Sequence, residues 1–193
     1  MTVLAAALVA FGASPAMANH KLGKLHWAAQ TASTVVNLTL DDSGVASSWR
    51  PGSVETDWGN SDQIDFNSSG SVEITADSGN FGNTGWLGAA SVFYTPGSGH
   101  ITDVEIQLNE FYSLNSDQKQ SVYCQELGHG LGLGHLHSRK YSPETSCMSD
   151  AFALHPNAHD YTQLQLIYNH ADGFNSFAAS QSRGRAKYVI PAR

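Results

Sequence analysis

Hydrophobic and polar residues alternate along four stretches in the first 110 residues of the chain. In the last of them, Val104, Ile106 and Leu108 fall on one face and polar residues separate them. Such alternation predicts strands with one buried face, and the glycine-rich third stretch predicts an edge strand. The predicted strands cover residues 34–40, 71–76, 85–94 and 101–108.

Two segments between these strands carry weaker patterns. The run Asp41-Asp42-Ser43-Gly44 predicts a turn directly after the first strand. Residues 47–70 mix tryptophans and aliphatic residues with many polar ones. Their periodicity does not choose between a short helix and irregular loops.

A helix is predicted to begin at Asn115 or Ser116, because either residue can cap the N-terminus and Asp117 suits the first turn. Glycines stand at every second position from 128 to 134. The helix is therefore expected to weaken near Gly130 and to end as the chain passes Gly132.

A second helix is predicted near His159 or Asp160, after a loop over residues 135–156. Its buried face is formed by Leu164, Ile167 and Tyr168. The basic residues 174–193 lack periodicity and predict a flexible, solvated tail.

The composition fits one globular domain, expected over residues 19–173. The chain has 193 residues, of which 41% are hydrophobic and 14% charged, and a net charge of −7. An acidic body argues against nucleic acid as a partner. No stretch is long enough to span a bilayer, and we expect a monomer.

The first 18 residues are typical of a signal peptide. An apolar run over residues 1–11 precedes Ala16-Met17-Ala18, which has the form cleaved by signal peptidases, although no Lys or Arg precedes the run. The alternative is a buried N-terminal helix. Export would suit a disulfide between Cys124 and Cys147, whose alternative is two buried thiols.

Residues 125–135 read Gln-Glu-Leu-Gly-His-Gly-Leu-Gly-Leu-Gly-His. This segment resembles the zinc signature H-E-x-x-H-x-x-G-x-x-H of the metzincin metallopeptidases, and its ending resembles the matrixin branch. Gln125 stands where the first histidine belongs. Residues 125 and 129 lie on one helix face, while Gly132 lets the chain reverse and return His135.

The resemblance implies a secreted endopeptidase that acts on protein or peptide substrates. Zn²⁺ would be held by His129, His135 and a weaker donor at Gln125. Glu126 would serve as general base toward a metal-activated water. The implied fold is α+β and zincin-like: a twisted mixed sheet packed on the active-site helix, then a Met-turn and a C-terminal helix.

Three further segments carry the resemblance. Met148 resembles the methionine of the Met-turn, and a bond between Cys124 and Cys147 would tie the active-site helix to that turn. The run Cys124-Gln125-Glu126 and the segment 156–161 (Pro-Asn-Ala-His-Asp-Tyr) resemble a matrixin-like subgroup of secreted bacterial proteins. Gln125 would then be a feature of that subgroup.

Alternatives remain open at the site. His137, His159 or Asp160 is a candidate to complete the metal site in place of Gln125. The main functional alternative is a secreted pseudoprotease that binds peptide or metal without cleavage. A third is a structural cell-surface domain with a purely stabilising metal.

The other candidate residues are given structural interpretations. Tyr161 is expected to pack rather than to stabilise an oxyanion. Five histidines are expected on the surface or in packing: His20, His26, His100, His155 and His170. Three oxygen donors form a candidate Ca²⁺ loop, for which an ordinary turn is the favoured alternative: Asp77, Asn80 and Asn83.

Overall fold

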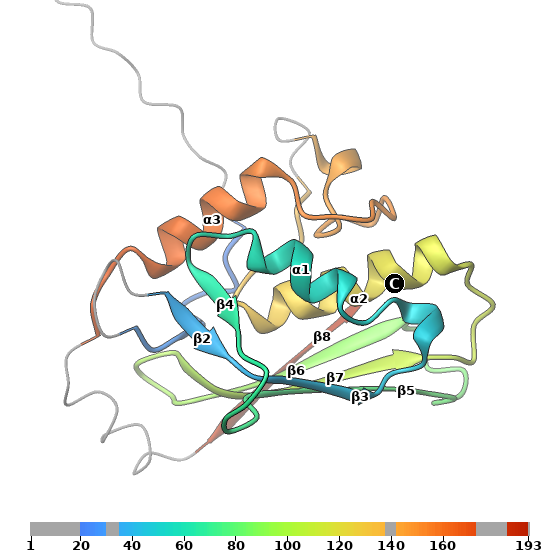
Figure 1. Cartoon of the computed structure of the whole chain (residues 1–193), viewed down its shortest axis with the longest axis horizontal. Helices are drawn as coiled ribbons and strands as arrows, with labels where there is room; N and C mark the ends of the chain where they lie inside the picture. The colour runs from blue at the N-terminus through green and yellow to red at the C-terminus, as the bar shows by residue number, and fades with distance from the viewer. Residues whose placement is uncertain (1–19, 30–34, 138–141, 173–184, 193) are drawn as a thin grey trace, which may run out of the picture.

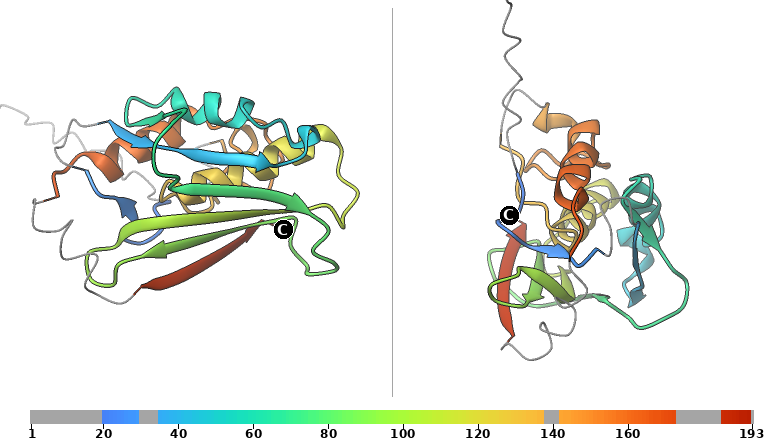
Figure 2. Two further views of the ribbon diagram at one scale, coloured as in Figure 1. Left: turned by 60° about the horizontal axis from the view of Figure 1, so that its bottom comes forward. Right: turned by 90° about the vertical axis from the view of Figure 1, so that its left-hand side faces the viewer.

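The computed structural model describes residues 20–29, 35–137, 142–172 and 185–192. These residues form a mixed α+β fold in which helices cover one face of a twisted sheet (Figures 1 and 2). The predicted leader, residues 1–18, lies outside the described ranges. The elements are β1 (His26–Trp27), β2 (Val36–Leu38), β3 (Leu40–Gly44), η1 (Ser47–Trp49), α1 (Ser53–Gly59), β4 (Ile64–Phe66), β5 (Ile74–Gly79), β6 (Gly88–Tyr94), β7 (His100–Asn109), α2 (Ser116–Gly130), η3 (Pro143–Thr145), α3 (Ala158–Tyr168) and β8 (Ala186–Ala192).

The main sheet has the strand order β3-β5-β7-β6-β8, and β1 pairs with the first residues of β7. Strands β1, β3, β5 and β7 run parallel, whereas β6 is antiparallel to both β7 and β8. Val104, Ile106 and Leu108 of β7 are buried, as their alternation predicts. A separate two-stranded parallel sheet joins β2 to β4.

Helix α2 begins where the sequence predicts. The Asn115 side chain accepts a hydrogen bond from the backbone N–H of Gln118 (2.9 Å), and the Gln118 side chain accepts one from the backbone N–H of Asn115 (3.0 Å). This reciprocal cap satisfies two amides that the first turn leaves unpaired. The predicted second helix is also confirmed, since α3 buries Leu164, Ile167 and Tyr168.

The turn at residues 146–148 is fastened to α2 by covalent and packing contacts. The predicted disulfide between Cys124 and Cys147 is present. Met148 is fully buried, and a Cβ atom added to Gly128 would collide with its sulfur and lie 2.6 Å from Trp58 Cζ2. Only glycine at position 128 therefore lets the methionine reach the helix backbone.

Three predictions of local structure are wrong or incomplete. The stretch expected as one strand over 34–40 is divided between β2 and β3, and the predicted turn at 41–44 lies within β3. Strand β3 has a largely exposed pattern, so no hydrophobic alternation marks it. The undecided segment 47–70 contains η1, α1 and β4.

The prediction of a flexible tail over residues 174–193 is wrong for residues 186–192, which form β8. This strand pairs along the whole of β6, so β6 is not the edge of the sheet. Its pairing uses backbone groups, which local side-chain periodicity does not reveal. Within the described part of the chain, no helix is long and apolar enough to cross a bilayer.

We expect Gly128→Ala to lower the free energy of unfolding by about 1–3 kcal/mol, because overpacking against Met148 outweighs the better helix propensity of alanine. Gly59→Ala is the matched control, since the nearest atom to its new Cβ would be Phe66 Cδ2 at 3.9 Å. Urea unfolding of the two variants measures the difference. Equal stabilities would contradict the proposed packing of Met148 on α2.

Candidate functional site

His129 is held on α2 as a neutral, buried imidazole. Its Nδ1 lies 2.8 Å from the carbonyl oxygen of Leu133 and can donate to it only when Nδ1 carries the proton. Its Nε2 is buried and has no hydrogen-bond partner among the described residues. Burial, with the neighbouring His135, lowers the pKa of His129 to about 3. The ring thus presents an uncommitted nitrogen lone pair, which is what a metal ligand requires.

The chain reverses after α2 at Gly132, whose φ of +92° favours glycine. A Cβ atom there would lie 2.5 Å from the Leu25 carbonyl oxygen, so the reversal is packed against the segment 20–25. The Leu22 N–H donates to the Gly132 carbonyl (2.8 Å). This reversal brings the His135 ring to 4.8 Å from that of His129, measured between centroids.

Gln125 is buried, and its amide Nε2 donates to the Ser149 carbonyl (3.2 Å). Oε1, the atom of this side chain able to ligate a cation, is therefore not the atom committed to Ser149. His135 also contacts this segment, since its Nδ1 lies 3.4 Å from Asp150 Oδ1. The segment that follows the Met148 turn thus contacts both Gln125 and His135.

Glu126 of α2 is fully buried where the helix packs on β6 and β8. Its Oε1 accepts a hydrogen bond from the backbone N–H of Ala192 (2.9 Å), while Oε2 has no partner within the described chain. Burial raises the pKa of Glu126 well above its ordinary value, against the opposing hydrogen bonds from the Ala192 and Ala90 backbone. The Ala192 carbonyl in turn accepts from the Leu87 N–H (2.9 Å). The backbone of Ala192 is therefore held on one side by Leu87, the residue before β6, and on the other by the Glu126 carboxyl.

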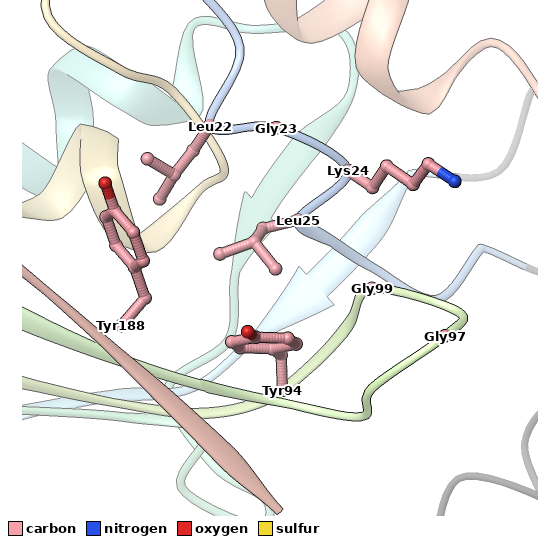
Figure 3. Close-up of a pocket in the computed structure, with 8 residues that line it drawn as sticks. All are labelled: Leu22, Gly23, Lys24, Leu25, Tyr94, Gly97, Gly99 and Tyr188. Atoms are coloured by element: carbon pink, nitrogen blue, oxygen red, sulfur yellow. The ribbon is translucent and has the colours of Figure 1, made fainter.

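A cavity of about 350 Å³ flanks β8. In Figure 3 the side chains of Tyr94 and Tyr188 rise from β6 and β8 toward Leu22 and Leu25. The segment 22–25, which contacts Gly132, is thus also one wall of the groove beside β8. The cavity lies at the end of β6 that holds Tyr94, and two leucines and two tyrosines contribute to its lining.

The alternative ligands named from the sequence have other surroundings. Asp160 Oδ2 accepts from the Ser146 hydroxyl (2.7 Å) and from the Asn157 N–H (2.6 Å), so Asp160 caps α3. His137 is exposed and stacks on His135, with ring centroids 5.6 Å apart. These contacts assign Asp160 a structural role. They place His137 at the exposed side of His135, next to the two neighbouring rings of His129 and His135.

His20 is buried, contrary to a surface position, although a packing role remains consistent with its contacts. Its Nδ1 lies 3.0 Å from the Gly134 carbonyl oxygen, and its Nε2 lies 3.3 Å from Asp160 Oδ1. Its ring centroid is 5.0 Å from that of His159. Burial lowers the pKa of His20, whose proximity also contributes to the lowered pKa of His129. No sequence signal connected His20 to the site, because His20 contacts the backbone of Gly134, which is distant in the chain.

Tyr161 and the candidate calcium loop have the packing and turn roles that the sequence predicts. The Tyr161 hydroxyl donates to the Asp57 carbonyl (2.7 Å). Asn80 Oδ1 accepts from the Gly82 N–H (3.0 Å), and Asn83 Oδ1 accepts from the Tyr112 hydroxyl (3.0 Å). These amide oxygens are used within the turn, which favours the turn over a Ca²⁺ site.

Three histidines expected in surface or packing positions instead surround one carboxylate. Asp172 Oδ1 lies 3.0 Å from His100 Nε2 and 3.5 Å from both His26 Nε2 and His170 Nε2. Burial alone would raise the pKa of Asp172, but the hydrogen bond from the Ala29 N–H and the neighbouring His100 and His26 hold it below its ordinary value. The four residues come from distant segments, so no sequence spacing reveals the cluster.

No protein-family model matches the chain, and no curated protein matches it. Among solved structures, the chain is similar to one titled "Structure of myroilysin". The TM-score is 0.42 and the sequence identity is 14%, over 77% of this chain and 97% of that one. A likeness at this level carries no argument about function, which rests on the chain's own residues.

The buried Glu126 carboxyl makes stability depend on pH. The pKa of Glu126 is raised in the folded state, so the unfolded chain releases this proton at lower pH than the folded protein does. The resulting loss of folding stability is absent at low pH and grows as pH rises above the ordinary pKa of 4.5. We expect the stability of Glu126→Gln relative to wild type to increase from pH 4 to pH 8, by up to about 1.4 kcal/mol per pH unit. Urea unfolding in EDTA measures this difference.

The exposed Glu144→Gln is the control and should give the same difference from wild type at both pH values. A Glu126→Gln difference that stays constant between pH 4 and pH 8 would show that the carboxyl ionises freely in the folded protein.

Proposed function

We propose that the protein is a secreted zinc-dependent endopeptidase of metzincin, matrixin-like type. The observation that carries the proposal is the hydrogen bond from the Ala192 backbone N–H to the Glu126 carboxyl. Ala192 N is the nitrogen of the Pro191–Ala192 peptide bond. The N–H of a peptide bond therefore donates to the Glu126 carboxyl. In the proposed mechanism, this carboxyl exchanges a proton with the leaving amine of the substrate.

His129, His135 and Gln125 would hold the zinc ion. The uncommitted, buried Nε2 of His129 fits this role, and the 4.8 Å separation of the two imidazole rings lets them converge on one ion. When bound, zinc would supply Lewis acidity toward water and toward the substrate carbonyl. Gln125 is a weaker donor than histidine, so we expect lower metal affinity than a three-histidine site has.

Strand β6 would hold the substrate in the manner in which it holds β8. The strand offers its outer backbone groups to an antiparallel partner, and the Leu87 N–H anchors the carbonyl of the residue whose nitrogen contacts Glu126. Extended polypeptides bind sheet edges in this way, through main-chain hydrogen bonds. The substrate class is therefore an extended peptide segment, and β8 competes with it for the same edge.

The turn and the disulfide support the assignment. Met148 packs under the helix that carries Glu126 and His129, as the methionine of a Met-turn would, and the disulfide between Cys124 and Cys147 joins the two elements. A disulfide suits the oxidising compartment of an exported protein. Secretion remains the part of the proposal that depends on the leader sequence.

A non-catalytic alternative has its own supporting observations. Gln125 weakens the metal site, and β8 occupies the edge of β6 beside Glu126. A secreted pseudoprotease that binds peptide at this edge would share both features. The presence of a carboxyl at position 126, where burial is costly, favours catalysis.

We expect a chain ending at Arg185, which lacks β8, to cleave unfolded casein in excess zinc about tenfold faster than the full chain, because an intramolecular competitor is gone. The synthetic peptide of residues 186–193, added in trans, should restore inhibition, whereas a scrambled peptide should not. Cleavage is measured by gel and by mass spectrometry of products. Circular dichroism verifies that the shortened chain is folded.

In the same shortened chain, Glu126→Ala should lower the cleavage rate by about 10²–10⁴-fold, because the proton-transferring carboxyl is removed. Glu144→Ala, on the surface, is the control and should cleave normally. Cleavage that survives Glu126→Ala would overturn the mechanism. Zinc binding without cleavage by the folded, shortened chain would establish the pseudoprotease instead.

A further inference from the structure

We propose that His26, His100, His170 and Asp172 bind one zinc ion at a second, structural site. The four residues come from β1, from the start of β7 and from the chain after α3. None of them belongs to the Gln125, His129 and His135 group. The inference stands on their geometry alone and does not depend on peptidase activity.

The donor atoms are spaced as ligands around a tetrahedral ion. Ligand bonds of about 2.0–2.1 Å to zinc place neighbouring donors of a tetrahedron about 3.3–3.5 Å apart. Asp172 Oδ1 lies 3.0–3.5 Å from the three Nε2 atoms, and His26 Nε2 lies 3.1 Å from His170 Nε2. The donor atoms of His26, His100 and Asp172 all lie within 4.8 Å of one another. His170 lies outside that group of three and reaches it through its contacts with His26 and Asp172.

In His26 and Asp172, the polar atom that points away from the cluster already has a hydrogen-bond partner. The atom that points into the cluster is thereby left for a metal ion. His26 Nδ1 lies 2.7 Å from the Lys24 carbonyl and can donate to it, which leaves Nε2 as a bare lone pair. Asp172 Oδ2 accepts from the Ala29 N–H (2.8 Å), which leaves Oδ1 for the cluster. Such outer hydrogen bonds orient the ligands of protein metal sites.

A purely hydrogen-bonded cluster explains the arrangement less well. His100 Nε2 can donate to Asp172 Oδ1 at 3.0 Å, which is an ordinary pair. The His26 and His170 rings, however, direct their Nε2 atoms at each other at 3.1 Å and at the same carboxylate oxygen. One oxygen cannot serve three imidazoles equally well, whereas a cation at the centre is ligated by all four donors at once.

The donor set indicates both the metal and its role. Three imidazole nitrogens and one carboxylate oxygen favour zinc over calcium or magnesium, which prefer oxygen ligands. Four protein ligands close the coordination shell, which is typical of a structural site. His26 and His170 line a surface cavity of about 300 Å³, which gives the ion an entry path. The ion would fasten β1 and the chain after α3 to the start of β7.

Metal stoichiometry in single variants tests the site. The metal-stripped full chain is dialysed against trace zinc, and zinc per chain is measured by plasma mass spectrometry. We expect about two zinc ions in wild type and one fewer in both His170→Ala and Asp172→Asn. His170 has a side chain 41% exposed, so its replacement is compatible with folding. His155→Ala is the control, because His155 pairs with Asp57 at the surface (2.7 Å) and should lose no zinc.

Cobalt and thermal melting give independent readouts. Co²⁺ should produce the intense visible bands of tetrahedral coordination, and Asp172→Asn should remove the part that this site contributes. Zinc should raise the melting temperature of His129→Ala, which keeps the second site, and raise that of Asp172→Asn by less. His155→Ala should respond as wild type does.

The outcomes separate this site from the proposed catalytic one. Loss of one zinc in Asp172→Asn and His170→Ala but none in His129→Ala would support the second site and count against the first. Loss in His129→Ala alone, with unchanged zinc content in folded Asp172→Asn and His170→Ala, would overturn the second site. A wild-type chain that binds no zinc or cobalt overturns both.

Discussion

The chain reversal at Gly132 is the constraint on which both histidine groups depend. Its positive φ turns the chain so that the ring of His135 approaches that of His129. The same turn is packed against the Leu25 carbonyl, where any side chain at position 132 would collide. The contact fixes the segment that continues into His26, so the geometry of the second cluster begins at the end of α2.

A second set of contacts holds α2 from its other side. Asp160 caps α3 and binds the Ser146 hydroxyl, and that hydroxyl accepts from the backbone of Met148 (3.0 Å). The disulfide at Cys124 then joins this turn to the helix. A rigid support of this kind matters most where a ligand is weak, because preorganisation reduces the entropy lost when the donors converge on an ion.

The parts of the fold that could be predicted are those whose signals are local. The cap of α2, the buried face of α3 and the alternation of β7 each lie within a short stretch of sequence, and the cysteine pair allows only one disulfide. Strand β8 and the cluster around Asp172 could not be predicted, because backbone pairing and convergence of distant residues leave no periodic pattern. Histidines are ambiguous singly, and only the fold shows that His26 and His100 face one carboxylate.

The cost of burying Glu126 connects the pairing of β8 with β6 to the proposed chemistry. A carboxyl in this position is poorly solvated, and the Ala192 N–H is the one hydrogen bond that β8 supplies to it. If β8 were displaced, the carboxyl would be more open to solvent and its raised pKa would fall toward the ordinary range. An extended substrate that replaces β8 would supply a peptide N–H at the same place and exclude water again, returning the pKa upward. A strand on β6 would thus raise the pKa of Glu126 by excluding water, while its N–H donates to the carboxyl and opposes that rise. In the proposed function, exclusion of water by β8 blocks the site, and exclusion of water by a bound substrate would keep Glu126 protonated.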